Sequence, residues 1–360
     1  MKNTIKTFAL FLTAGAMLAS CDSYLDRQPD EPLTSDNIFK KQKTTLQYLT
    51  NIYSYQPDYE APACVSSNDD IPWEACSDET SFAYLDRSYT QINYNSWNPS
   101  MYLYRNDTYN TPYKGIREAN YFMQHVHECP ELTDTDKGYY YNEARFLRAH
   151  FYAMMLPVYG PVFLIGDDPV DFTQSGLDQR ERNTWDECVN YVANELWEAA
   201  KGLPDSWPDI YYGRATKGAA LAARARLLLY SARKLFNGNE LYKGIVNRNG
   251  DHLFPTQYDE KKWELAAQAA KDVMNLNLYS LVGADGTDPY ASFNTLFTSV
   301  GSGTGGATEK IYTRIASGYQ WRVVTTPPSV GGTAYGGYGV TQKQVDAFAM
   351  ANGRYPITGY

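Results

Sequence analysis

Residues 213–230 read GRATKGAALAARARLLLY, and this stretch indicates the fold class more clearly than any other part of the chain. Gly213 to Thr216 suit a turn followed by a helix N-cap, because a threonine hydroxyl accepts hydrogen bonds from the free N–H groups of a first helical turn. The residues that follow are rich in alanine and leucine, and apolar side chains lie on almost every face as far as Phe236. The sequence therefore predicts a central, buried helix over 216–236.

Periodic apolar residues predict further helices on both sides of this one. The expected spans are 35–53, 113–128, 139–156, 184–200 and 262–276. Thr184 and Glu187 match a capping box at the start of the fourth helix. Pro157 is expected to end the third helix, with Gly160 and Pro161 forming the exit turn.

The helix expected over 262–276 carries small residues that suit close helix packing. Its expected buried face comprises Trp263, Ala266, Ala267, Ala270, Val273 and Met274. This spacing is similar to the tetratricopeptide pattern, although no strict 34-residue period repeats. The predicted fold class is mostly α, with tetratricopeptide-like helical repeats, long irregular insertions and a few short strands.

Two long insertions interrupt the helices. Residues 57–111 lack a sustained period, and loops of this length in compact proteins are usually functional or disordered. After residue 280 the chain becomes rich in glycine, tyrosine and tryptophan. Short strands are expected there at 311–315 and 322–325.

The N-terminus has the order of features found in a lipoprotein signal peptide. Lys2 and Lys6 precede an uncharged apolar run over 8–19, which is too short to span a bilayer because a spanning helix needs about 20 apolar residues. The run ends in Leu-Ala-Ser-Cys, residues 18–21, which has the form of a lipobox. We expect cleavage after residue 20 and lipidation of Cys21; the alternative is an ordinary signal peptide followed by a chance cysteine.

The charge excludes a nucleic-acid partner. Residues 1–20 carry two lysines and no acid, so their removal changes the formal charge from −9 to −11. An acidic chain without a basic cluster does not bind phosphate backbones. Tyrosine is unusually abundant, with 32 residues in 360. Tyrosine and tryptophan stack on sugar rings and also pack helical cores, and both roles are expected here.

Cysteines and histidines suggest little metal chemistry. Cys64 and Cys76 lie in one loop-like segment where a local disulfide is an option. His125 and His127 are two apart, so on a helix their imidazoles point about 200° from each other. No metal site and no cofactor are therefore expected. His150 lies within the third helix and is expected to be packed or hydrogen-bonded there.

Several ordered stretches resemble the SusD/RagB family of glycan-binding surface lipoproteins. The stretches that carry the resemblance are CDSYLD followed by Pro29 (21–29), EARFLRA running to YGPV (143–162), GRATKGAA with RARLLLY (213–230), the helix at 263–274 and the segment 342–353 with VDAF. Each stretch alone is weakly specific, but all five occur in the family's order.

The resemblance implies a division of the chain and a function. Residues 1–20 would be the signal peptide, 21–236 an N-terminal SusD-like helical domain, and 260–360 the start of a C-terminal RagB/SusD domain truncated at Tyr360. The protein would be held in the outer membrane by its lipid alone and would face outward. Asp22, which follows the lipidated cysteine, leaves the inner membrane as an alternative, because this residue retains lipoproteins there in some bacteria. It would bind oligosaccharide or polysaccharide and deliver it to a SusC-like TonB-dependent transporter.

Family glycan sites are built from aromatic and polar residues on the insertions, which selects six candidates by position. They are Trp73, Asp78, Tyr84 and Trp97 from the first insertion, with Tyr319 and Trp321 from the later one. The resemblance implies binding without catalysis. Two alternatives stay open. The first is a lipid-anchored glycoside hydrolase, because such an enzyme needs only two correctly separated carboxylates and the sequence has many. The second is a helical-repeat adaptor that binds protein and no sugar.

Overall fold

The computed structural model describes residues 35–56, 76–83, 92–98, 108–167, 180–286, 288–299, 307–314, 325–328, 334 and 336–357. The helices in these ranges are α3 (Ser35–Ile38), α4 (Gln42–Tyr53), α6 (Asn110–His125), α7 (Asp134–Tyr159), α8 (Trp185–Gly202), α9 (Lys217–Ala232), α10 (Lys261–Met274), α11 (Pro289–Thr298) and α13 (Gln342–Asp346). Two strands, β1 (Thr80–Phe82) and β2 (Tyr338–Val340), form an antiparallel sheet. Within these ranges, no helix is long and apolar enough to cross a membrane.

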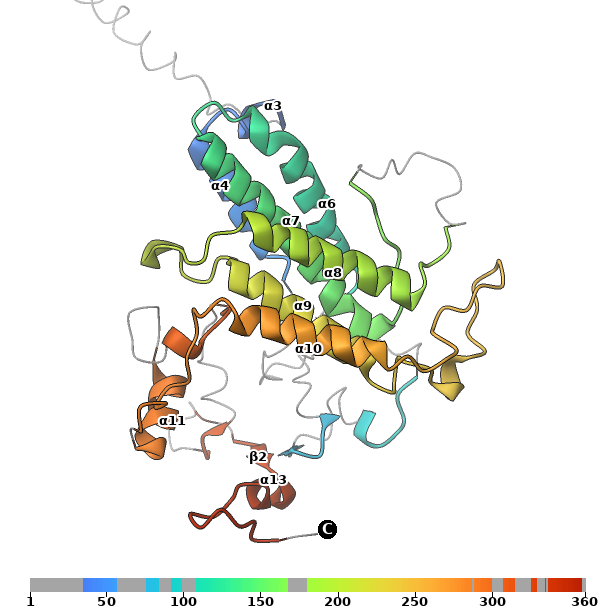
Figure 1. The fold of residues 1–360 in the computed structure, drawn as a ribbon, viewed down its shortest axis with the longest axis vertical. Helices are drawn as coiled ribbons and strands as arrows, with labels where there is room; N and C mark the ends of the chain where they lie inside the picture. Colours follow the sequence, from blue (N-terminus) through green and yellow to red (C-terminus); the bar gives the residue numbers. More distant parts are fainter. Residues whose placement is uncertain are drawn as a thin grey trace, which may run out of the picture.

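Helices that follow one another in the chain pack side by side. In sequence order, α6 packs on α7, α7 on α8, α8 on α9 and α9 on α10, while α4 covers α6 and α7. Figure 1 shows these helices as one body, with α11, β2 and α13 beyond α10. The mostly α fold built from successive helix pairs is as predicted.

The core of this body is aromatic as well as aliphatic. Trp185 is fully buried, its ring stacks on Phe236 with the centroids 4.0 Å apart, and its indole N–H donates to the Ser231 hydroxyl at 2.9 Å. Burying the polar edge of a large ring is tolerated because that edge keeps a hydrogen bond. The contact ties the start of α8 to the end of α9.

Threonine caps begin two of the helices as expected. The Thr184 hydroxyl accepts from the backbone N–H of Glu187 at 3.3 Å, and the Glu187 carboxylate accepts from the Thr184 N–H at 2.7 Å. The hydrogen bond from the Thr184 backbone holds the pKa of Glu187 below its ordinary value. Thr216 caps α9 by accepting from the N–H of Ala219 at 3.2 Å.

Several helix boundaries differ from the predictions: α6 begins and ends three residues earlier than expected, α7 begins at Asp134, and two further differences have a cause in the packing of the core. The span 35–53 is broken between α3 and α4, where Phe39 turns into the core against Phe122 and the Thr44 hydroxyl donates to the Ile38 carbonyl. α9 ends at Ala232 and not at Phe236, because Arg233 is extended and the turn brings Phe236 onto Trp185. Tertiary packing decides both boundaries.

Pro157 does not end the third helix, which runs from Asp134 to Tyr159. Proline lacks an N–H and so removes one hydrogen bond, but the helix continues for two residues beyond it. The helix ends at Gly160, which has a φ of 68° and donates its N–H to the Leu156 carbonyl at 2.9 Å. A positive φ favours glycine, so Gly160 is the residue that ends α7.

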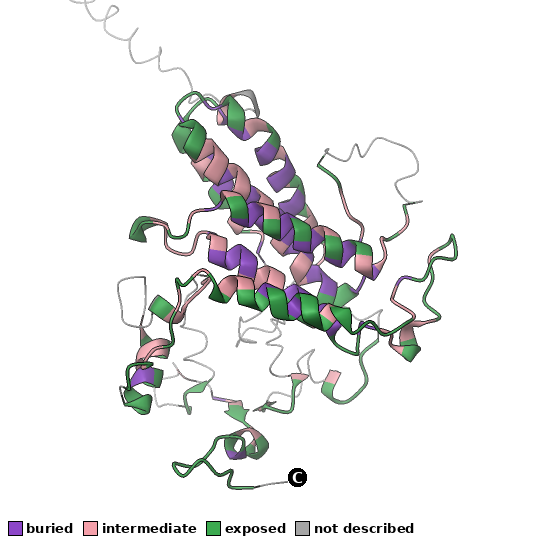
Figure 2. Cartoon of the chain, viewed as in Figure 1, coloured by how far each residue is buried: buried purple, intermediate pink, exposed green. Residues whose placement is uncertain are grey.

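The expected buried face of α10 is largely wrong. Ala266 and Ala269 are buried, whereas Ala267 and Ala270 are exposed and Met274 is 74% exposed. α10 packs mainly on α9 and lies at the edge of the helical body, and Figure 2 shows its outward surface as exposed. Apolar periodicity identifies a wide apolar arc, but the position of the neighbouring helix decides which part of the arc is covered.

The strand expected at 311–315 is also wrong over its described part, since residues 311–314 form no strand. Residues 322–324 of the other expected strand lie outside the described residues. The strands that form are β1, within the first insertion, and β2, which begins inside a second glycine-rich stretch at 331–339 and ends just after it.

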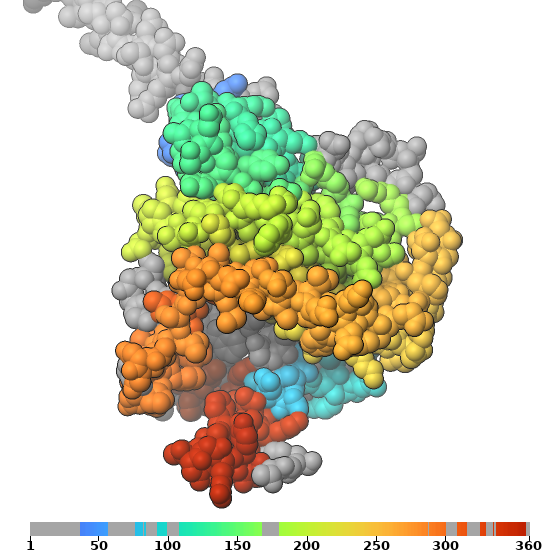
Figure 3. Space-filling view, viewed as in Figure 1, coloured from blue at the N-terminus to red at the C-terminus, as the bar shows by residue number. Residues whose placement is uncertain are grey.

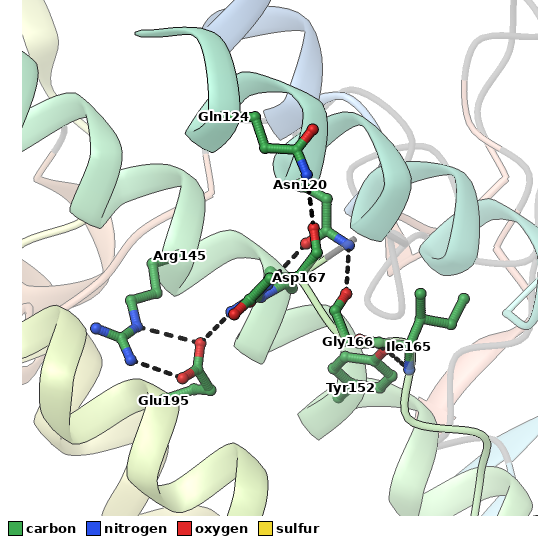
Figure 4. A network of polar contacts seen from close by, with 9 residues as sticks. Asn120, Gln124, Arg145, Tyr152, Ile165, Gly166, Asp167 and Glu195 are labelled. Atoms are coloured by element: carbon green, nitrogen blue, oxygen red, sulfur yellow. Dashed lines mark hydrogen bonds and ion pairs between the residues drawn. The ribbon is translucent and has the colours of Figure 1, made fainter. Parts of the chain in front are cut away.

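A buried ionic network joins α7 to α8 and to the chain that leaves α7 (Figure 4). Glu195 of α8 accepts two hydrogen bonds from Arg145, at 2.7 and 3.1 Å, and a further one from Arg148. Burial alone would raise the pKa of Glu195, but the two arginines outweigh it and the pKa is lowered. Arg148 also contacts Asn120 and Asp167, so the irregular chain that follows α7 is attached to the helical body.

A second buried ion pair fixes the turn that precedes α9. The Arg214 guanidinium makes a bidentate contact with the fully buried Glu143, and Tyr53 donates to the same carboxylate at 2.5 Å. The guanidinium carbon also lies 4.5 Å from the centroid of the Trp207 ring and 4.9 Å from that of Tyr140. Pairing and stacking together compensate for the loss of water around these charges. The GRAT stretch is therefore held between α4, α7 and α9.

Candidate functional site

The two insertions meet at the β1–β2 sheet. Thr80, Ser81 and Phe82 pair with Val340, Gly339 and Tyr338 in antiparallel register. Ladder hydrogen bonds continue on both sides, from Ala83 N–H to the Gly337 carbonyl at 2.8 Å and from Thr341 N–H to the Glu79 carbonyl at 2.9 Å. Figure 3 shows the described part of the first insertion, in cyan, beside the C-terminal segment, in red, at the end of the molecule away from α4 and α6. We call residues 78–83 and 337–343 the clasp.

Asp78 lies in the clasp and is exposed. Its carboxylate forms an ion pair with the Lys343 ammonium, and the Lys343 hydrogen bond holds the pKa of Asp78 below its ordinary value. Asp78 is therefore ionised at neutral pH, with a partner that the sequence alone did not suggest. An exposed carboxylate of this kind can still accept hydrogen bonds from sugar hydroxyls.

Trp97 is the other predicted residue that the structure describes. Its side chain is 42% exposed, and it follows a turn at Asn95, which has a φ of 53°. A half-exposed indole leaves part of its apolar surface open to solvent, and stacking on a pyranose ring uses such surface.

The later insertion is attached to the helical body through Tyr312. Its ring lies edge-on to Phe146 at 5.4 Å and to His150 at 5.9 Å between centroids, and its hydroxyl accepts from the Gln56 amide at 2.7 Å. A second bond joins the hydroxyls of Tyr212 and Thr313 at 3.3 Å. His150 is packed within α7, as expected, and stacks on Phe146.

The remaining predicted site residues lie outside the described residues. They are Trp73, Tyr84, Tyr319 and Trp321, together with the lipidation site Cys21. Cys64 also lies outside them, so the expected Cys64–Cys76 disulfide stays a prediction. Cys129 and Cys188 are buried free thiols.

His125, one of the two histidines considered as metal ligands, has other contacts. The Nδ1 atom of His125 lies 2.8 Å from a Glu128 carboxylate oxygen, and its ring contacts Phe39 and Tyr121. In the part of the chain that the structure describes, no three His, Cys, Asp or Glu side chains are grouped to hold a metal ion.

Sequence reasoning missed Thr341 and Lys343, which join the two insertions. Thr341 is the N-cap of α13 and was recognisable as such, because a threonine followed by a short helical pattern is a typical cap. Its second role, closing the clasp onto residues 78 and 79, has no local signal. Also missed were three exposed aromatic side chains on α11: Tyr290, Phe293 and Phe297.

Comparison with solved structures shows the same fold. A SusD-like protein from Bacteroides fragilis is 23% identical with a TM-score of 0.66, and the match covers 89% of this chain and 55% of that one. The surface glycan-binding protein A of Bacteroides uniformis is 16% identical with a TM-score of 0.61, covering 86% and 62%. A SusD superfamily protein from Bacteroides thetaiotaomicron is 16% identical with a TM-score of 0.59, covering 86% and 63%.

This chain thus spans less than two thirds of the length of each of these structures. A search of curated proteins finds no match. The model of the SusD-like family, which is described as starch-binding and associating with the outer membrane, matches residues 23–229. Because this match covers more than half of the sequence, the chain belongs to the SusD-like family.

Proposed function

We propose that this protein is a lipid-anchored outer-membrane protein that binds a glycan through its insertions and passes it to a TonB-dependent transporter, without catalysis. The observation that carries the proposal is membership of a family described as starch-binding and associated with the outer membrane. The meeting of the two insertions at the clasp supports it, because the predicted sugar-binding residues come from these two insertions.

The physical basis of binding would be stacking of aromatic rings on the apolar faces of sugars. Such contacts bury no charge, and each contributes modestly. Trp97 and Asp78 are the described candidates, and Trp73, Tyr84, Tyr319 and Trp321 complete the proposed set. Modest affinity suits a protein that must release its ligand to a partner.

The binding proposal is tested on the protein lacking residues 1–21, with a panel of neutral hexa- and heptasaccharides that includes α-glucans, β-glucans, xylans and mannans. We expect saturable binding measured by calorimetry, with no new reducing ends after long incubation. Release of reducing ends would contradict the non-catalytic proposal, and absence of binding to every member would contradict glycan recognition.

A matched pair of tryptophans locates the site. Trp97 in the first insertion and Trp197 on α8 are 42% and 38% exposed. Trp97→Ala is expected to weaken glycan binding about tenfold, the size of one lost stacking contact of about 1.4 kcal/mol. Trp197→Ala should leave it unchanged. Equal losses in both variants would contradict a site on the insertions.

The anchor and the partner need separate experiments. Incorporation of labelled fatty acid should be lost in Cys21→Ala, and protease added to whole cells should cleave the wild-type protein if it faces outward. Purification from solubilised outer membranes should retain a TonB-dependent transporter. Labelling that persists in Cys21→Ala would contradict lipidation at this residue.

A further inference from the structure

The clasp joins segments that are more than 250 residues apart in sequence, yet each of its strands has only three residues. A two-stranded sheet this short is barely stable by itself in water. Its stability must therefore come in part from contacts beyond the ladder, and some of these join residues 78 and 79 to Thr341 and Lys343.

Thr341 joins the two segments through both its backbone and its side chain. Its N–H donates to the Glu79 carbonyl at 2.9 Å, and its hydroxyl donates to the Asp78 carbonyl at 2.7 Å. The same hydroxyl oxygen accepts from the N–H of Gln344 at 3.2 Å, and this hydrogen bond caps the N-terminus of α13. One side chain thus caps a helix and holds the chain that enters β1.

The neighbouring ion pair is a weaker candidate for this role. Lys343 and Asp78 are both well exposed, and exposed pairs contribute little because water screens them. The Thr341 hydroxyl, in contrast, donates its hydrogen bond to the backbone carbonyl of Asp78, and it therefore holds the backbone itself in place.

The clasp restricts where residues 78–83 of the first insertion can lie. Asp78, itself a proposed ligand contact, is part of the clasp. With the clasp open, this segment would have to be ordered at the moment of binding, which lowers affinity.

We propose that Thr341 is a positioning residue for the glycan site: by closing the clasp, it holds residues 78–83, which include the proposed ligand contact Asp78, in their binding arrangement. The inference rests on the proposed function. If opening reduces the clasped population to roughly a tenth, the apparent dissociation constant rises about tenfold.

The test compares Thr341→Val with wild type on the panel member that wild type binds most tightly. Thr341→Val removes the hydroxyl and keeps the backbone N–H, and about a tenfold loss of affinity is expected. Thr341→Ser keeps the hydroxyl and should bind as wild type does. Thr50→Val is the matched control, since the exposed Thr50 hydroxyl donates only to the Leu46 carbonyl within α4.

A crosslink distinguishes positioning from a general loss of structure. The hydrogen bonds at 79/341 and 83/337 make Thr80 and Val340 a non-hydrogen-bonded pair, in which the Cα atoms approach closely enough for a disulfide. Oxidising Thr80→Cys/Val340→Cys in the Thr341→Val background should restore the affinity, and reduction should remove it again. Peptide mapping would verify the crosslink, because Cys76 lies nearby in sequence.

The outcomes separate the two proposals. If wild type binds no panel member, the proposed function is contradicted and this inference with it. If wild type and Thr341→Val bind equally, or if the oxidised crosslink does not restore binding, only the positioning role is contradicted. Thermal unfolding of the helical body should be the same in all variants.

Discussion

At the scale of single residues, the chemistry of this protein is dominated by buried polar groups with specific partners. Glu143 and Arg214 pair inside the helical body, and Glu195 holds Arg145 and Arg148. The sequence predicted helices for all of these residues except Arg214, which it predicted in the turn before α9, but it carries no sign of which acid meets which arginine. Pairing depends on how the helices cross, and the partners are 47 to 71 residues apart.

His150 should make stability depend on pH. Burial lowers its pKa to about 4, and in the described part of the chain its Nδ1 atom has no hydrogen-bond partner. The folded protein therefore keeps His150 neutral, while the unfolded chain takes up a proton below a pKa of about 6.5. Stability should fall as the pH drops from about 6.5 to 4, by up to about 3 kcal/mol.

The measurement is urea unfolding of wild type and His150→Gln between pH 7 and pH 4. The variant lacks the titrating group, so its stability should fall less steeply over this window. Parallel profiles would show that His150 is not kept neutral by burial.

At the scale of elements, caps and glycines decide where helices end, as α7 illustrates. A Cβ added to Gly160 would lie 2.8 Å from the Phe254 ring, and the positive φ is unfavourable for other residues. Gly138, in the same helix, has nothing within 4 Å of an added Cβ. Gly160→Ala should therefore destabilise the protein by more than about 1 kcal/mol, and Gly138→Ala should stabilise it by about 0.5–1 kcal/mol.

Chemical denaturation of the two variants provides the measurement, and each serves as the control of the other. Equal effects of the same sign would contradict the assignment of Gly160 as the residue that ends α7.

The two faces of α10 can be told apart by charge. Ala269 is buried against α9, whereas Ala267 is exposed. Ala267→Glu should change the free energy of unfolding by less than about 0.5 kcal/mol, as surface substitutions usually do. Ala269→Glu buries an unpaired carboxylate and should cost about 3 kcal/mol or more. Urea titration would measure both free energies of unfolding. A larger loss of stability in Ala267→Glu than in Ala269→Glu would show that the face expected from the sequence is the buried one.

At the scale of the whole molecule, Tyr312 couples the later insertion to the helical body. Tyr312→Phe keeps the ring but loses the bond from Gln56, at a cost of about 1 kcal/mol. Tyr312→Ala also removes the ring from Phe146 and His150, and should cost about 3–5 kcal/mol. Hydrogen exchange in Tyr312→Phe should increase over residues 307–314 and stay unchanged in α8; a uniform increase would contradict this local coupling.

The sequence by itself determined the helical class, the family and most helix positions, including the caps at Thr184 and Thr216. These features are encoded within a few neighbouring residues, because helix hydrogen bonds and caps join positions three or four apart. Only the tertiary structure decided the break after Ile38, the covered face of α10, the buried ion pairs and the clasp between residues 78–83 and 337–343. Those features depend on contacts between segments that are far apart in sequence. A local sequence pattern does not determine which distant segment packs against it.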